Sequence, residues 1–104
     1  MVAIARANHI RVILGSIPPA DRFPWHAGIE PAERIRTLNT WLKSYADQQH
    51  LVYLDYYTAM ATPEGAMKPD LAIDKAVHPN TDGYALMQPL AETAIRKALA
   101  RPAP

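Results

Sequence analysis

Hydrophobic residues along the chain fall into two short compact runs and two longer segments with helical spacing. The compact runs are residues 10–15, which are rich in β-branched side chains, and residues 51–55. They predict two strands buried in a parallel sheet. In residues 31–50 the apolar positions recur with the period of one helix face, and residues 80–99 repeat the pattern. Both longer segments are therefore predicted to be helices.

Prolines and glycines mark the connections between these elements. Residues 16–29 hold three prolines, a glycine and three aromatic or histidine side chains, so they predict a long loop, which is more often functional than idle. Residues 57–72 predict an irregular connection with about one helical turn. The Ala-rich residues 1–8 are typical of the last turns of a helix, and the tail 100–104 is expected to fray.

The helical spacing also predicts which side chains face the sheet. Trp41 and Tyr45 are expected in the core or at a helix–sheet interface. The apolar face expected on the last helix comprises Tyr84, Met87, Leu90, Ala91, Ala94, Ile95 and Ala98.

The order of elements predicts an α/β fold. Strand, helix, strand and helix follow one another, which favours right-handed crossovers between parallel strands. Two parallel strands leave an unpaired edge on each side and need cover on both faces. Residues 1–104 are therefore interpreted as a single domain that forms part of a larger sheet.

Composition and charge argue against several classes of function. The 104 residues are 49% hydrophobic and 20% charged, and eleven Lys and Arg stand against ten Asp and Glu, a net charge of +1. Without a basic run, neither nucleic acid nor an anionic membrane is an expected partner. There is no cysteine, and no apolar run approaches the roughly 20 residues of a membrane span. The compartment stays open.

One segment carries a pattern with chemical meaning. Ligands of open parallel sheets bind beyond the carboxyl ends of the strands, and His78 lies in a loop there, four residues after Asp74 and directly before Pro79. An acid that close can accept a hydrogen bond from Nδ1 and leave Nε2 free to take a proton from a hydroxyl. A surface histidine with an incidental acid nearby is the plainer alternative.

The wider sequence resembles one family of hydrolases. His78-Pro-Asn-x-x-Gly-Tyr84 resembles the last sequence block of SGNH/GDSL hydrolases, where an acid, a histidine and a following helix stand together. Four upstream segments also resemble that family, in the right order: Val12-Ile-Leu-Gly-Ser-Ile-Pro-Pro19, Asn39-x-Trp41-Leu42, Tyr53-Leu-Asp-Tyr-Tyr-Thr-Ala-Met60 and Gly65-x-Met67-Lys-Pro69.

This resemblance implies the C-terminal half of a serine ester hydrolase with a three-layer α/β/α, flavodoxin-like fold. His78 would be the general base and acid, Asp74 its orienting carboxylate, and small acyl esters the substrates. No cofactor is implied, and the acids and histidines show no metal-ligand spacing. The chain departs from the family twice. Lys75 occupies the usual position of the acid, so either the loop carries one extra residue and Asp74 still serves, which is the favoured interpretation, or the acid role is weakened. In addition, the Gly-Asp-Ser nucleophile block does not occur.

Four further residues have candidate roles in or near such a site, and Ser16 is the possible nucleophile among them. Ser16 follows a strand, but Pro18 and Pro19 prevent the helix that normally follows a nucleophile, so a strand-end hydrogen bond is the favoured role. Trp25 and His26 are candidates for the substrate pocket. Asp55 is expected to cap the next turn.

Two hypotheses follow for the whole chain. In the first, the chain is part of an ester hydrolase that acts together with the N-terminal half of the domain or with a homo-oligomer mate. In the alternative, it is a non-catalytic α/β interaction module that assembles through its exposed sheet edges.

Overall fold

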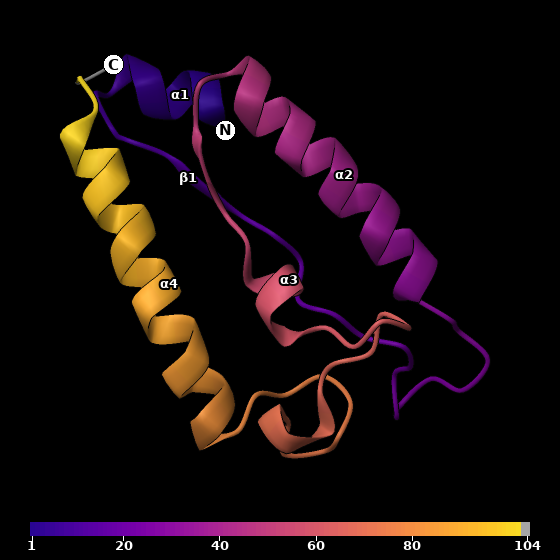
Figure 1. Ribbon diagram of the computed structural model, residues 1–104. Helices are drawn as coiled ribbons and strands as arrows, with labels where there is room; N and C mark the ends of the chain where they lie inside the picture. The colour runs from indigo at the N-terminus through magenta and orange to yellow at the C-terminus, as the bar shows by residue number, and fades with distance from the viewer. Residues whose placement is uncertain (103–104) are drawn as a thin grey trace.

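A computed structural model describes residues 1–102 of the chain. Its elements, in order, are α1 (Val2–Ala7), β1 (Ile13–Gly15), α2 (Ala32–Gln48), β2 (Val52–Leu54), α3 (Tyr56–Met60), a 3-10 turn (Pro69–Leu71) and α4 (Thr81–Ala100). The strands run between α4 and α2 (Figure 1). The predicted α/β order is therefore confirmed, and so is the long loop between Gly15 and Ala32.

The sheet consists of two parallel strands. Ile13 pairs with Val52, and Gly15 pairs with Leu54. The N–H of Ser16 extends the ladder to the carbonyl of Leu54 at 2.9 Å. Each strand has three residues, fewer than the hydrophobic runs predicted. The hydrophobic runs overestimate the lengths of the strands. A ladder of hydrogen bonds extends only where a neighbouring strand supplies partners, and each strand here has a single neighbour among residues 1–102.

Small residues make the contact between α4 and the sheet. Ala94 and Ala98 of α4 are buried against Val52, with Ile13 and Leu54 beside them. Helix α2 lies against β2 and buries Ile35, Asn39 and Ala46. Alanine allows the backbone of a helix to approach the strands closely, so a compact core forms with few large side chains.

Several aromatic and aliphatic side chains expected in the core are exposed instead. Trp41, Tyr84 and Ile95 keep 59%, 60% and 49% of their surface accessible. Tyr45 is half-buried and stacks on Trp41 at a centroid distance of 5.2 Å. Helical spacing identified the apolar faces correctly, but two strands are too narrow to cover them. The prediction of burial is therefore wrong for Trp41, Tyr84 and Ile95, whereas Ala94 and Ala98 of the same predicted face of α4 are buried.

The connection after β2 is more regular than expected. Asp55 caps α3, accepting from the N–H of Thr58 at 3.0 Å, as predicted for it. A second core cluster of Met60, Met67 and Ala72 packs with Leu86 and Met87 of α4. This cluster holds residues 60–72 against the first turns of α4. Residues 57–72 thus contain most of α3, which is the helical turn expected there, and a 3-10 turn in addition.

At the C-terminal end, α4 continues through Ala100, one residue into the tail that was expected to fray. Residues 101 and 102 are exposed and outside the helix, and residues 103 and 104 lie outside the described part of the chain. Among residues 1–102, no helix combines the length and the apolar character that crossing a membrane requires.

A glycine allows the turn before the candidate site to touch α4. A Cβ added at Gly83 would lie 2.4 Å from the carbonyl oxygen of Leu71, a distance that no real contact shows. The same glycine donates its N–H to Oδ1 of Asn80, the N-cap of α4, at 2.9 Å. The start of the helix and the 3-10 turn are therefore joined at this point.

Gly83→Ala is expected to lower the free energy of unfolding by about 1–3 kcal/mol, the usual cost of forcing an extra group into a packed site. Urea unfolding measures this change. The matched control is Gly15→Ala, because a Cβ there meets nothing within 4 Å. Equal losses in the two variants would contradict the close approach as the reason for a glycine at position 83.

Candidate active site

The segment that carries Asp74 and His78 is closed at its base. The N–H of Ile73 donates to the carbonyl of His78 at 2.8 Å, and the N–H of Asn80 donates to the carbonyl of Leu71 at 2.8 Å. Asn80 also donates through Nδ2 to the carbonyl of Asp70 at 2.8 Å. Asn80 therefore fixes the end of the loop and the first turn of α4 at once.

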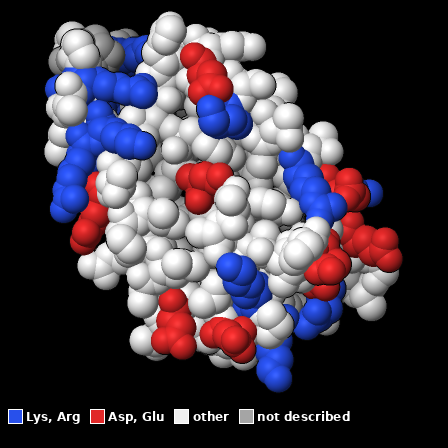
Figure 2. All heavy atoms as spheres, in the orientation of Figure 1, with Lys and Arg blue, Asp and Glu red and all other residues white. Residues whose placement is uncertain are grey.

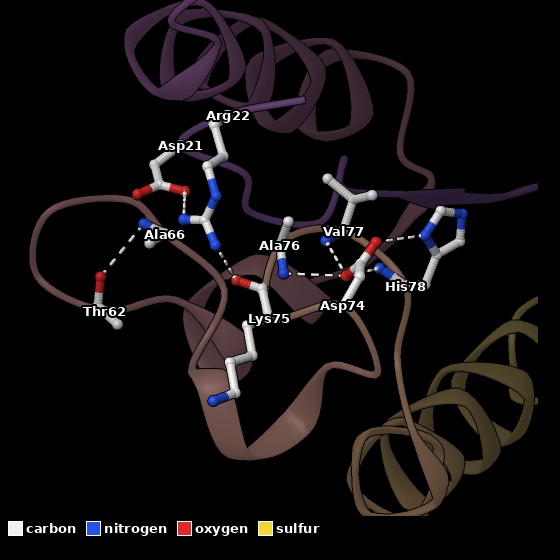
Figure 3. Close-up of polar contacts among 9 residues, drawn as sticks. All are labelled: Asp21, Arg22, Thr62, Ala66, Asp74, Lys75, Ala76, Val77 and His78. Atoms are coloured by element: carbon white, nitrogen blue, oxygen red, sulfur yellow. Dashed lines mark hydrogen bonds and ion pairs between the residues drawn. The ribbon is translucent and has the colours of Figure 1, made fainter. Parts of the chain in front are cut away.

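The carboxylate of Asp74 organises the inside of this loop (Figure 3). Its Oδ1 accepts the backbone N–H groups of Ala76 and Val77 at 2.9 Å and of His78 at 3.2 Å. Its Oδ2 lies 2.6 Å from Nδ1 of His78. Lys75 has a φ of 56°, in the left-handed region. The left-handed conformation of Lys75 thus lets the backbone turn at the extra residue, so that the acid and the histidine still meet.

These contacts set the charge of the pair. The hydrogen bond from His78, followed by those from the backbone N–H groups of Val77, Ala76 and His78, holds the pKa of Asp74 well below its usual range. The acid is therefore ionised at neutral pH, and an ionised carboxylate only accepts, so Nδ1 carries the proton. Nε2 is then the acceptor. It has no hydrogen-bond partner within residues 1–102, and 67% of the His78 side chain is exposed.

This arrangement can act as a general base. A neutral imidazole whose Nδ1–H is bound to a carboxylate takes a proton at Nε2, and the carboxylate stabilises the resulting imidazolium. The imidazole lacks a hydroxyl partner in the described part of the chain. Residues 1–102 also contain no group of three or more acids, histidines or cysteines that could hold a metal ion.

Ser16 makes the strand-end hydrogen bond that its position in the sequence favours. It is buried, and its Oγ accepts the N–H of Tyr57 at 3.0 Å, which joins the end of β1 to the start of α3. No hydrogen bond links Ser16 to His78 in the part of the chain described.

Of the two pocket candidates, only Trp25 approaches His78. The ring centroids of Trp25 and His78 are 6.2 Å apart, and Phe23 stacks on Trp25 at 5.2 Å. Trp25 keeps 66% of its surface accessible. His26 is exposed, and its backbone N–H donates to the carbonyl of Phe23 at 3.0 Å. The long loop therefore presents an aromatic surface beside the imidazole.

Comparison with known proteins decides the family. The sequence model of the GDSL-like lipase/acylhydrolase family matches residues 1–86. The chain belongs to this family. A comparison with curated proteins found no match.

Solved structures of family members resemble the chain closely. A protein of Bacteroides fragilis, provisionally assigned as an acylhydrolase, is 40% identical with a TM-score of 0.88, over 94% of this chain and 48% of its own. A GDSL-like lipase of Bacteroides thetaiotaomicron is 37% identical with a TM-score of 0.87, over 93% and 48%. The esterase domain of a zebrafish retrotransposon ORF1 protein shares the fold at 21% identity and a TM-score of 0.71, over 91% and 55%.

These comparisons confirm the predicted family and the parallel α/β fold. The chain spans about half the length of the solved structures that it matches. The tripeptide Gly-Asp-Ser does not occur in the sequence.

One contact at the site was not predicted from the sequence. Arg22 of the long loop donates to the carbonyl of Lys75 at 2.8 Å, 53 residues further along the chain. No local spacing or motif relates positions so far apart, so sequence reasoning had no signal from which to find it.

Asp74 is expected to make the chain sensitive to acid. A carboxylate with a lowered folded-state pKa contributes its full stabilisation above its ordinary value of 3.8 and loses it as the pH falls through the folded-state pKa. The free energy of unfolding should therefore fall more steeply below about pH 4 in the wild type than in Asp74→Asn. Urea unfolding at a series of pH values measures both slopes.

Asp70→Asn is the matched control for this experiment. Asp70 is an exposed acid of the same loop, and its carboxylate makes no hydrogen bond within residues 1–102. The free energy of unfolding of this variant should fall with pH as steeply as that of the wild type. Parallel curves for wild type and Asp74→Asn would contradict the assignment.

Proposed function

We propose that this chain provides the acid–base half of a serine ester hydrolase. The single observation that carries the proposal is the 2.6 Å contact between Nδ1 of His78 and Oδ2 of Asp74, with the other carboxylate oxygen occupied by three backbone N–H groups. A carboxylate bound in this way cannot rotate freely, so the imidazole is held in one tautomer and one orientation. Family membership supports the same role.

The proposed reaction is hydrolysis of a small acyl ester. His78 Nε2 takes the proton of a serine hydroxyl as the serine oxygen attacks the ester carbonyl carbon. The imidazolium then returns this proton to the departing alkoxide as the carbon–oxygen bond breaks. Water, activated by the same nitrogen, cleaves the acyl-serine and releases the acid. Throughout, Asp74 remains ionised and stabilises the imidazolium.

The serine and the oxyanion donors would come from a partner half-domain. Sheet geometry supports this, because within residues 1–102 β1 pairs on one side only and presents a free edge to another strand. Large apolar side chains on the helices remain exposed, including Trp41, Ile95 and Leu99. In Figure 2, basic side chains gather near the chain ends, while the face between α4 and α2 carries few charges. A face with few charges suits packing against the rest of a domain.

Trp25 is proposed as part of the substrate pocket. Its ring lies beside His78, and Phe23 supports it from behind. An aromatic wall next to the base would contact the acyl or alcohol portion of an ester through apolar surface. No contact with the pair supports a similar role for His26, which stays a prediction.

Complementation tests the proposed function. We expect the chain, combined with a half-domain of the family that carries the Gly-Asp-Ser block, to hydrolyse p-nitrophenyl acetate when neither part does so alone. His78→Ala should abolish this activity. Asp74→Asn should lower kcat by about 10³–10⁴-fold, since the imidazole loses both its orientation and its counter-charge.

Two results would contradict parts of this proposal. If a folded complex hydrolyses the ester equally well with His78→Ala, His78 is not the base. If the isolated chain is active and His78→Ala removes that activity, a nucleophile exists within it and Ser16 is the residue to test. His50→Asn is the control, because His50 is exposed at the opposite end of β2 and asparagine tolerates its φ of 56°.

The exposed apolar surface also favours the second candidate function, an interaction module. If this surface drives assembly, the isolated chain should self-associate as its concentration rises, and Ile95→Glu should weaken that association. Thr93→Glu is the matched control, because it places the same charge at another exposed position of α4. Sedimentation measures the mass. A monomer at all concentrations would argue against assembly through this surface.

A further inference from the structure

Arg22 reaches the candidate site from the long loop (Figure 3). One guanidinium nitrogen donates to the carbonyl of Lys75 at 2.8 Å, and another lies 3.2 Å from Oδ1 of Asp21. Arg22 does not touch Asp74 or His78 directly. Any effect on the pair must therefore pass through the backbone at Lys75.

The carbonyl of Lys75 and the N–H of Ala76 belong to the same peptide unit. Because that unit is planar and trans, its C=O and N–H point in opposite directions. Arg22 holds the carbonyl end, and Oδ1 of Asp74 holds the N–H end at 2.9 Å. A peptide bound at both ends cannot rotate, so the guanidinium fixes one of the donors that orient the carboxylate.

The backbone at Lys75 needs such support. Its φ of 56° lies in the left-handed region, where a side chain with a Cβ is unfavourable. Relaxation of Lys75 to an ordinary conformation would turn the 75–76 peptide and withdraw the N–H of Ala76 from Asp74. The residue that lengthens the acid–histidine spacing is thus the residue that Arg22 holds in place.

We propose that Arg22 is a positioning residue for the Asp74–His78 pair. Its role in catalysis rests on the proposed function, whereas its role in holding the pair can be measured in the chain alone. Arg22 acts on the Lys75 carbonyl, the 75–76 peptide orients Asp74 Oδ1, and Oδ2 of the same carboxylate binds Nδ1 of His78. The same loop carries Phe23 and Trp25, so one contact fixes both the pair and the aromatic surface beside it.

NMR of the isolated chain tests this role. Arg22→Ala is expected to shift the acid titration midpoint of the Asp74 carboxyl upward and to broaden or remove the Nδ1–H signal of His78. Arg22→Lys retains a cationic donor and should restore most of both. Arg96→Ala, at an exposed arginine of α4, should change neither. An Asp74 titration and a His78 signal identical in wild type and Arg22→Ala would overturn the proposal.

Lys75→Gly provides a second test that removes no contact to Arg22. Glycine adopts positive φ readily, so the loop should keep its shape without the guanidinium. The effect of Arg22→Ala on the Asp74 titration should therefore be smaller in a Lys75→Gly background. An equal effect in both backgrounds would refute the proposed route through the 75–76 peptide.

The two proposals can fail separately. A complemented hydrolase that is inactive, with NMR responses as expected, would refute the proposed function and leave the positioning role of Arg22 intact. Unchanged NMR spectra would refute the role of Arg22 whatever the activity.

Discussion

The pairing of β1 with β2 is the interaction on which the rest of the structure depends. It is short, yet α4 packs against both strands and α2 against one of them, so the pair of strands is the surface that both helices share. The same pairing brings the ends of both strands together, where Ser16 joins the first turn of α3. A parallel pair is normally covered on both faces and paired on both edges. Here the helices provide cover, and one edge of each strand stays unpaired in the part of the chain that the structure describes.

The candidate site depends much less on that sheet. Asp74 binds groups at most four residues away, and Asn80 binds groups at most ten residues away. The second core cluster and the close approach at Gly83 attach this loop to α4. Local contacts close short loops, which costs little conformational entropy. The acid–histidine pair is therefore preorganised mainly by contacts within residues 70–83.

The sequence predicted the local features better than the long-range ones. Helix α2, the cap at Asp55 and the proximity of Asp74 to His78 follow from spacing and capping chemistry within a few residues. The burial of Trp41 and Tyr84 was predicted wrongly because a helix face indicates only which side chains are apolar. It does not indicate how wide a sheet will cover them. The contact between Arg22 and Lys75 depends on how two loops meet, and a single sequence gives no information on that.

The difference between local and long-range contacts also separates the two departures from the family pattern. The extra residue at Lys75 can be accommodated locally, whereas the missing nucleophile block cannot. An extra residue between acid and histidine changes only the path of the backbone, and a left-handed Lys75 restores the distance between the two side chains. The missing nucleophile block has no such local remedy, because in the proposed function the serine and its oxyanion donors come from a part of the domain outside this sequence. Ser16 is a poor substitute, because Pro18 and Pro19 lack the backbone N–H groups that an oxyanion would need, and the Ser16 hydroxyl already accepts the N–H of Tyr57. In the proposed function, this chain thus supplies the acid–base chemistry, and a second structural unit supplies the nucleophile.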